Sequence, residues 1–300
     1  MNYYEKYSHI YIIYILIVCI FANYYYLKTD IMLIEFTVGN FLSFKDKKTL
    51  SLEAAPITEH LESNVFKTNQ FELLKGAVIY GANSGGKSNF IKAMSTMRRI
   101  VLHSLEFSSA KKLDVTPFLL NTETEKSPSF FEVLFLVDNI RYRYGFEVDN
   151  IRIRAEWLFE VRKKTEKPLF IREGDAIEVM KTFQEGENLE EKTRNNSLFL
   201  SVVDQFNGTT AKRIIQWFNN LVTISGLSHE DYKDTTFSLL EDKKTRYSLL
   251  DFYTNLDLGF DNILTWYSEK PIAETLDIDI YPPWEHRDYF DIKIETRHQK

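Results

Sequence analysis

The sequence is poor in the residue types that mark disulfide scaffolds, zinc sites and flexible linkers. A single cysteine, Cys19, among 300 residues excludes a disulfide-stapled protein, a zinc site built on cysteines and a cysteine nucleophile in the rest of the chain. Eleven glycines and seven prolines leave no room for a low-complexity linker. The six histidines are scattered, without the His-x3-His spacing of a helical metal site. We therefore predict no metal site other than one for Mg²⁺.

The chain also lacks an excess of basic residues. Its formal net charge of -6 argues against a surface built as a whole to bind nucleic acid. The content of 44% hydrophobic and 27% charged residues is typical of a folded globular protein. A chain of 300 residues suffices for one large α/β domain or two ordinary ones. The bulk composition predicts a cytoplasmic protein.

The first 31 residues differ from the rest. Residues 7–27 form an uncharged run of 21 residues, centred on the apolar stretch 10–22. Roughly 20 apolar residues span a bilayer, so one interpretation is a transmembrane anchor that holds the protein on a membrane. The other interpretation is a non-native extension ahead of a true start at Met32. In both cases the chemistry is expected after Met32.

Hydrophobic periodicity predicts the secondary structure of the remaining chain. Alternation and short apolar runs predict strands at 33–38, 48–53, 77–80 (buried and parallel), 130–137, 141–148, 151–162, 169–172 and 289–296. Helical spacing predicts helices at 87–105, 197–206 and 210–221. The aromatic pairs Trp217/Phe218 and Trp266/Tyr267 are expected in the core, on helix-like stretches. Asp138-Asn139 and Asp149-Asn150 predict two-residue hairpin turns, and 163–168 a longer one.

One motif carries chemistry. Residues Gly81-Ala82-Asn83-Ser84-Gly85-Gly86-Lys87-Ser88 match the phosphate-loop (Walker A) pattern, between a predicted strand and a predicted helix. The glycines let the backbone approach phosphates closely, and successive N–H groups form an anion site at the helix N-terminus. Lys87 is expected to hold the β- and γ-phosphates and Ser88 to bind Mg²⁺. The motif therefore predicts a nucleotide and Mg²⁺ as ligands.

Other blocks accompany the loop. They are Asn40-Phe41-Leu42-Ser43-Phe44-Lys45 between two predicted strands, and residues 130–133, 141–148, 156–158 and 199–206. Together with the loop they resemble the ABC-type ATPases of the SMC, RecF and OLD group, most of all the bacterial AAA family ATPases of phage-defence and abortive-infection loci. The resemblance covers about residues 35–225. It implies an α/β fold, a P-loop NTPase of ABC-ATPase type, with a mixed sheet, an antiparallel β-meander and a following helical subdomain.

The resemblance also implies ligands and roles for individual residues. ATP is the nucleotide it implies, with Lys45 near the phosphates or the adenine and Gln205 as the glutamine that links Mg²⁺ to the helical subdomain. The alternatives are a solvated loop lysine for Lys45 and an ordinary surface amide on a helix for Gln205. The family further implies an effector protein, such as a nuclease, as partner.

Two motifs of that group are missing from the sequence. One is a hydrophobic strand that ends in Asp-Glu, and the other is a Ser-Gly signature that closes over the partner's ATP. The nearest stretch to the first is 133–139, where Asn139 replaces the glutamate, and 225–228 is a poor match to the second. In the resembled group both motifs follow a strand like 292–298. The expected organisation is an extension (1–31), the N-terminal lobe of the ATPase (32–225) and an incomplete helical or connecting region (226–300).

Basic residues concentrate in the predicted meander. They are Arg141, Arg143, Arg152, Arg154, Arg162, Lys163, Lys164, Lys167 and Arg172. One interpretation is a track for a nucleic-acid backbone. The alternative is a solvated sheet face, because acidic residues interleave with the basic ones and reduce the field that such binding needs.

Three hypotheses about function follow. The first is an ATPase module that couples ATP binding to dimerisation, with a second copy or a complementary C-terminal half in a head-to-tail dimer, and to an effector. The second is a truncated or split-gene product that does not hydrolyse ATP and acts only by binding. The third, a small-molecule kinase, is disfavoured by the long meander and the lack of an Arg-rich lid. Whether this chain turns ATP over is left open.

Overall fold

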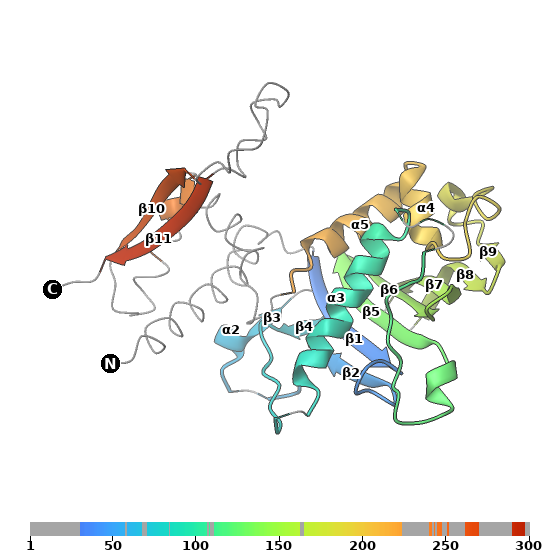
Figure 1. Cartoon of the computed structure of the whole chain (residues 1–300), viewed down its shortest axis with the longest axis horizontal. Coiled ribbons are helices and arrows are strands. Elements are labelled where there is room, and N and C mark those ends of the chain that lie inside the picture. The colour runs from blue at the N-terminus through green and yellow to red at the C-terminus, as the bar shows by residue number, and fades with distance from the viewer. Residues whose placement is uncertain are drawn as a thin grey trace. The chain divides into compact units, whose positions relative to one another are not determined.

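The computed structural model describes residues 31–57, 59–67, 71–83, 85–106, 108, 111–162, 165–223, 240–241, 243, 245–247, 251, 262–269 and 290–297. Contacts divide the chain into two compact units. One comprises residues 26–223, and the other comprises 1–25 together with 224–300. Figure 1 shows the elements of both units. The uncharged run 7–27 lies outside the described residues.

The larger unit is built on a seven-stranded sheet in the order β2-β1-β5-β6-β7-β8-β9. The strands are β1 (Ile31–Gly39), β2 (Lys48–Ser51), β5 (Ser129–Val137), β6 (Ile140–Val148), β7 (Ile153–Arg162), β8 (Thr165–Glu173) and β9 (Ala176–Val179). All neighbouring strands in this order run antiparallel. The predicted meander is confirmed, and so is its hairpin at Asp138 and Asn139, whose φ angles of 49° and 63° suit a tight two-residue turn.

Two other connections of the meander differ from the prediction. The prediction of a two-residue turn at Asp149-Asn150 is wrong, because the loop extends over 149–152. The Asp149 carboxylate accepts the backbone N–H groups of Ile151 and Arg152. The longer turn at 163–168 is also wrong, because β8 already begins at Thr165. Pro168 therefore lies within β8, where the pairing with β7 shifts register and a missing N–H is tolerated. The short strand β9 is not predicted by the sequence pattern.

Three helices cover one face of this sheet, as Figure 1 shows. They are α3 (Lys87–His103), α4 (Phe199–Gln205) and α5 (Thr209–Asn220), and they confirm the three predicted helices. Two 3-10 turns, η1 (Thr124–Lys126) and η2 (Gln184–Gly186), lie in the connecting loops. The main core fills the space between helices and sheet; the rings of Phe135 and Trp217, for example, have centroids 4.4 Å apart. Trp217 and Phe218 are core residues, as expected.

A small hairpin packs on the opposite face. It consists of α2 (Leu61–Asn64), β3 (Val65–Lys67) and β4 (Glu72–Leu74), none of which the sequence pattern predicts. Leu73 of β4 is fully buried in a second, smaller cluster with Leu134 and Leu136 of β5. Both faces of the sheet are thus covered next to β5.

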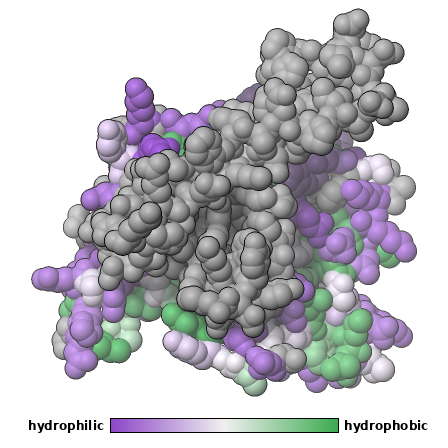
Figure 2. Space-filling model, turned by 60° about the vertical axis from the view of Figure 1, so that its left-hand side comes forward, coloured by the Kyte–Doolittle hydropathy of each residue, from purple (hydrophilic) through white to green (hydrophobic). Residues whose placement is uncertain are grey.

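The buried parallel strand predicted at 77–80 is wrong. The segment has no regular structure, and Val78, Ile79 and Tyr80 are 73%, 43% and 88% exposed. A buried parallel strand needs parallel neighbours with which its backbone can pair. Every pairing within the described sheets is antiparallel. The mixed sheet is therefore not found in the part of the chain that the structure describes. Among the coloured residues in Figure 2, hydrophobic patches lie beside hydrophilic ones.

The smaller unit contains a two-stranded antiparallel sheet of β10 (Asn262–Glu269) and β11 (Phe290–Arg297). β11 confirms the strand predicted at 289–296. The helix-like assignment of Trp266 and Tyr267 is wrong, because both lie in β10; aromatic and β-branched residues favour a strand where a partner strand is present. Among the helices that the structure describes, none combines the length and the apolar character needed to cross a membrane.

Candidate functional site

The predicted phosphate loop leads directly into the longest described helix. Gly86 is the residue before α3, with φ of 87°, and Lys87 is the first residue of this 17-residue helix. Gly81, Ala82 and Asn83 are exposed, and the Gly85 N–H donates to the Ala82 carbonyl at 3.0 Å, which closes the loop into a tight turn. Ser84 lies outside the described residues. The loop is thus an exposed turn at a helix N-terminus, as the motif predicts.

Space explains two of the glycines. A Cβ on Gly85 would lie 2.9 Å from the Ala82 carbonyl oxygen, and a Cβ on Gly86 would lie 2.6 Å from the Ser43 hydroxyl. Gly86 also has a positive φ, which L side chains rarely adopt. The turn that brings the chain into α3 therefore requires glycine at both positions.

Lys87 folds back over the loop. Its ammonium donates hydrogen bonds to the carbonyls of Gly81 and Ala82, both at 2.7 Å. An ammonium has three donors, so this arrangement leaves one for a further acceptor. The positive charge is held in the bend of the loop without a carboxylate partner among the ion pairs of the described residues.

The start of α3 is left open to an anion. No side chain caps the helix at Gly86, and its first turn contains no acidic residue. The first N–H groups of a helix lack partners within the helix, and the helix dipole adds a partial positive charge there. Ser88, in this first turn, is exposed. These residues fit a phosphate group with a bound Mg²⁺, because the first N–H groups of α3, one ammonium and one hydroxyl belong to the same helix start and its first turn contains no acidic residue.

The structure brings one further block of the sequence to the loop. The turn between β1 and β2 places the Ser43 hydroxyl 3.0 Å from the Asn89 side-chain nitrogen, in the first turn of α3. Lys45 belongs to the same turn and is exposed. The sequence places Ser43 in a block that accompanies the loop, but it predicts neither Asn89 nor the contact between them, because the two residues are far apart in the chain and no motif couples them.

Gln205 lies elsewhere. It is exposed at the last position of α4, and α4 packs at the far end of α3, where the Ser201 hydroxyl donates to the Val101 carbonyl at 2.8 Å. A helix of the length of α3 is about 25 Å long, so the loop and Gln205 are not brought together.

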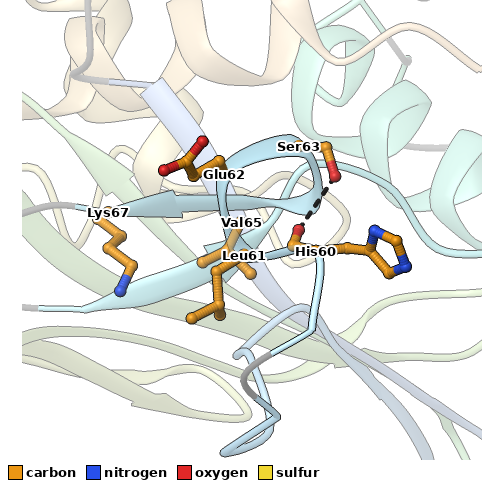
Figure 3. Close-up of a pocket in the computed structure, with 6 residues that line it drawn as sticks. All are labelled: His60, Leu61, Glu62, Ser63, Val65 and Lys67. Carbon is orange, nitrogen blue, oxygen red and sulfur yellow. Dashed lines mark hydrogen bonds between the residues drawn. The ribbon is translucent and has the colours of Figure 1, made fainter.

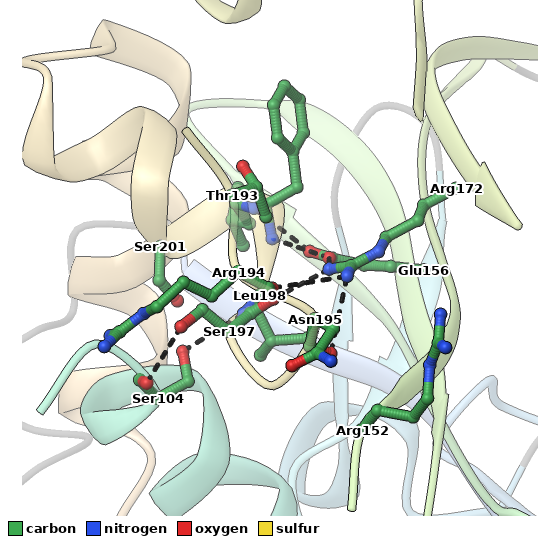
Figure 4. A network of polar contacts seen from close by, with 12 residues as sticks. Ser104, Arg152, Glu156, Arg172, Thr193, Arg194, Asn195, Ser197, Leu198 and Ser201 are labelled. Atoms are coloured by element: carbon green, nitrogen blue, oxygen red, sulfur yellow. Dashed lines mark hydrogen bonds and ion pairs between the residues drawn. The ribbon is translucent and has the colours of Figure 1, made fainter. Parts of the chain in front are cut away.

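That far end of α3 is built on buried polar groups, shown in Figure 4. The Glu156 carboxylate, 0% exposed, accepts the N–H groups of Phe199 and Leu200 at 2.6 and 3.0 Å and the Tyr144 hydroxyl at 3.0 Å. Arg172 is 1% exposed and lies 3.8 Å from Glu156. Burial raises the pKa of Glu156 and lowers that of Arg172, because it penalises both charged forms, and it raises the pKa of Tyr144 well above its usual value.

This network is structural rather than a ligand site. Arg172 donates to the carbonyls of Gly174 and Ser197 at 2.9 and 2.7 Å, so its guanidinium is used within the fold. The residues lie under the helices, away from the exposed loop. The sequence contained a signal for the burial of Glu156, because side chains alternate along a strand and Glu156 lies on the same face of β7 as the buried Leu158.

Most arginines of the predicted basic track have acidic partners. Arg143 lies 3.1 Å from Glu132 and 2.9 Å from Glu166, and the other pairs are Arg152–Asp175, Arg154–Asp149, Arg162–Glu160 and the buried Arg172–Glu156. Such pairing weakens the field that a phosphate backbone would need. Nucleic-acid binding by this face stays a prediction.

A hollow lies on the small hairpin. It has a volume of about 940 Å³ and is lined by His60, Leu61, Glu62, Ser63, Val65 and Lys67. In Figure 3 the polar side chains of His60, Glu62 and Lys67 point in different directions rather than toward one another. Within the described residues, no group of three or more His, Cys, Asp or Glu side chains is arranged to hold a metal ion. The hollow offers no converging chemistry.

The loop, the helix it opens and the sheet beneath them are consistent with an α/β fold, and the family match defines the class of protein, an AAA-type P-loop ATPase. The chain belongs to the family described as "AAA domain, putative AbiEii toxin, Type IV TA system", whose model matches residues 77–271. This match begins just before the phosphate loop and includes the meander and all of α3, α4 and α5. Searches of curated proteins and of solved structures returned no match.

Proposed function

We propose that this chain is an ATP-binding module of the ABC, SMC, RecF and OLD type that couples nucleotide binding to dimerisation and to a partner effector, in a toxin–antitoxin or phage-defence setting. One observation carries the nucleotide-binding part: the Lys87 ammonium lies over an exposed glycine loop at the uncapped N-terminus of α3. The family match supports the ATPase class. The motif and the resemblance support ATP as the nucleotide.

Each residue has a binding role in this proposal. Backbone N–H groups of Gly86, Lys87 and Ser88 donate to the phosphate oxygens, and their dipoles add to that of the helix. Lys87 keeps its carbonyl partners and directs its remaining donor at a terminal phosphate. Ser88 supplies a hydroxyl ligand to Mg²⁺, which, when bound, neutralises charge on the β- and γ-phosphates.

Hydrolysis requires more than these residues. A carboxylate that orients water is needed, and we propose that a second copy or a complementary polypeptide supplies it in a head-to-tail dimer. The alternative, a module that binds ATP without hydrolysing it, is favoured by the end of β5. There Asp138 forms the hairpin turn and lies 3.2 Å from Arg213 of α5, so it is used in the fold.

The test replaces Lys87 and compares it with a neighbouring lysine. Lys87→Ala removes the charge from the loop, whereas Lys92→Ala removes the same charge from an exposed position on α3. The one charge-assisted hydrogen bond that Lys87 gives to the phosphate, at about 1.5–3 kcal/mol, corresponds to an affinity loss of roughly 10- to 150-fold. We expect this loss of MgATP affinity in calorimetric titration for Lys87→Ala alone, with an unchanged circular dichroism spectrum.

Two outcomes would contradict the proposal. If Lys87→Ala keeps the affinity of the wild type, the loop does not bind the phosphates. If Lys92→Ala loses as much as Lys87→Ala, the effect is one of general charge. Phosphate release by the chain alone, measured at the same ATP concentration, then separates the hydrolysing module from the binding-only alternative.

A further inference from the structure

We propose that the β1–β2 turn, residues 40–46, is a brace that positions the phosphate loop, with Ser43 and Asn89 as its positioning residues. The inference rests on the proposed nucleotide binding and adds a part of the chain that the motif does not contain. The Asn89 side-chain amide donates to the Ser43 hydroxyl at 3.0 Å. The two residues are on separate elements, so this contact joins the β1–β2 turn to the first turn of α3.

The brace is itself rigid. Phe41 and Phe44 exchange both backbone hydrogen bonds, at 3.0 and 2.8 Å, which closes a tight turn around Leu42 and Ser43. Asn40 and Leu42 have positive φ angles of 46° and 49°, a conformation that only a well-restrained turn maintains in residues with side chains. Ser43 is thereby held at a defined position.

The brace is also anchored to the rest of the unit. The buried Asn40 side chain donates to the carbonyls of Thr124, Ser127 and Pro128 and accepts the Phe118 N–H. The Leu42 N–H donates to the Thr116 carbonyl at 3.0 Å. The turn therefore cannot move toward or away from the phosphate loop without breaking several hydrogen bonds at once.

Two contacts fit the brace to the start of α3. The space that a Cβ of Gly86 would need is taken by the Ser43 hydroxyl, at 2.6 Å, so Ser43 packs directly on the last loop residue. One turn further, the rings of Phe44 and Phe90 meet edge to face with centroids 6.0 Å apart. The brace thus touches the loop residue and the helix residues on either side of Lys87 and Ser88.

This arrangement solves a conflict at the helix start. In a capping box the side chain of the third helix residue accepts the N–H of the residue before the helix, which stabilises the helix but uses a donor that a phosphate needs. Asn89 occupies this position, and its amide is directed to Ser43 instead. The helix start is thereby fixed from outside, and its N–H donors stay uncapped.

The test uses Ser43→Ala, Asn89→Ala and the double variant. Thr49→Ala is the matched control, because it removes a hydroxyl hydrogen bond of 2.8 Å, to Thr37, from the same β1–β2 hairpin. One measurement is amide hydrogen exchange at Gly85 and Phe90 in the nucleotide-free chain, because their N–H groups donate to the Ala82 and Gly86 carbonyls. The other is the dissociation constant of MgATP, measured alongside that of adenosine, which has no phosphates.

We expect faster exchange at the helix start and a three- to tenfold loss of MgATP affinity in each single variant, the range that about one hydrogen bond supplies. The double variant should lose no more than the larger single loss, because both residues act through one contact. The affinity of the variants for adenosine should stay at the wild-type value. For Thr49→Ala, the amide exchange and the affinities for MgATP and adenosine should all stay at their wild-type values.

The outcomes separate this inference from the proposed function. Unchanged exchange in Ser43→Ala and Asn89→Ala overturns the brace, whether or not the chain binds ATP. Faster exchange with unchanged MgATP affinity overturns its role in binding. A wild-type chain that does not bind MgATP, with exchange still faster in the variants, overturns the proposed function and leaves the brace as a restraint on the loop.

Discussion

The two ends of α3 use the same kind of groups in opposite ways. At its N-terminus the exposed loop leaves N–H donors uncapped and holds one ammonium without a carboxylate partner in the described chain. At its C-terminus the Ser104 hydroxyl accepts the Leu198 N–H, the Ser104 carbonyl accepts the Ser197 hydroxyl, and both residues are buried. One end keeps polar groups for a ligand, and the other uses them within the fold. Stability and nucleotide binding should therefore be separable by mutation.

The largest effect is expected at the buried end. Glu156→Ala leaves two backbone N–H groups and the Tyr144 hydroxyl without their acceptor, and the Arg172 guanidinium without its counter-charge, in a buried site. Breaking a buried pair in this way costs about 3–5 kcal/mol. We expect this loss in the free energy of unfolding by urea. The MgATP affinity per folded molecule should stay within twofold of the wild type.

The control for this variant is an exposed pair. Asp175→Asn removes the partner of Arg152, whose contact of 2.7 Å involves a 74% exposed carboxylate. Solvent-exposed pairs contribute at most about 1 kcal/mol. If Glu156→Ala were no more destabilising than Asp175→Asn, or if it weakened MgATP binding beyond its effect on folding, the two ends of α3 would not be independent.

A smaller effect is expected where α4 meets the helix end. Ser201→Ala removes the hydroxyl that donates to the Val101 carbonyl at 2.8 Å. A single neutral hydrogen bond contributes about 0.5–1.5 kcal/mol, and alanine fits the space that serine leaves. Urea unfolding should show a loss in this range. A change in MgATP affinity in Ser201→Ala would contradict the separation, because it would show that the far end influences the loop.

The sequence was informative where one local pattern decides the structure. The loop at 81–88 and the helix after it follow from glycine and lysine spacing, and the hairpin at Asp138-Asn139 follows from two residues that tolerate positive φ. Each of these depends on neighbours in the chain. The family match assigns the chain to an ATPase family, but it identifies no further residues of the site.

The sequence was uninformative where a distant partner decides. The apolar run Val78–Tyr80 predicts a buried strand, yet no strand of the described sheets receives it. Trp266 and Tyr267 fit a helix by spacing and pair in a strand because β11 is present. Ser43 and Asn89 are 46 positions apart in the chain, and no local sequence pattern predicts their contact. Partners far apart in the chain are the part of a fold that periodicity cannot supply.

The smallest effect concerns pH and a partly buried carboxylate. Partial burial alone would raise the pKa of Asp149, but hydrogen bonds from the Arg152 and Ile151 N–H groups and from Arg154 hold it below its usual value of 3.8. The folded chain therefore releases this proton more readily than the unfolded chain. The stabilisation is present above pH 3.8 and is lost as pH falls through the folded pKa.

Asp149→Asn should remove this dependence. At neutral pH we expect the free energy of unfolding of the wild type to be higher than that of the variant by less than about 1 kcal/mol, because solvent screens the ion pair. The difference should shrink toward zero as the urea titrations are moved to acid pH. Glu156 should behave in the opposite sense: burial raises its pKa, so its contribution is present below its ordinary value of 4.5 and declines as pH rises through the folded pKa. The difference in the free energy of unfolding from the wild type should therefore change with pH in opposite directions in Asp149→Asn and Glu156→Ala. If both differences changed in the same direction, the degree of burial would not distinguish the two carboxylates, and the contrast between the two parts of this unit would fail.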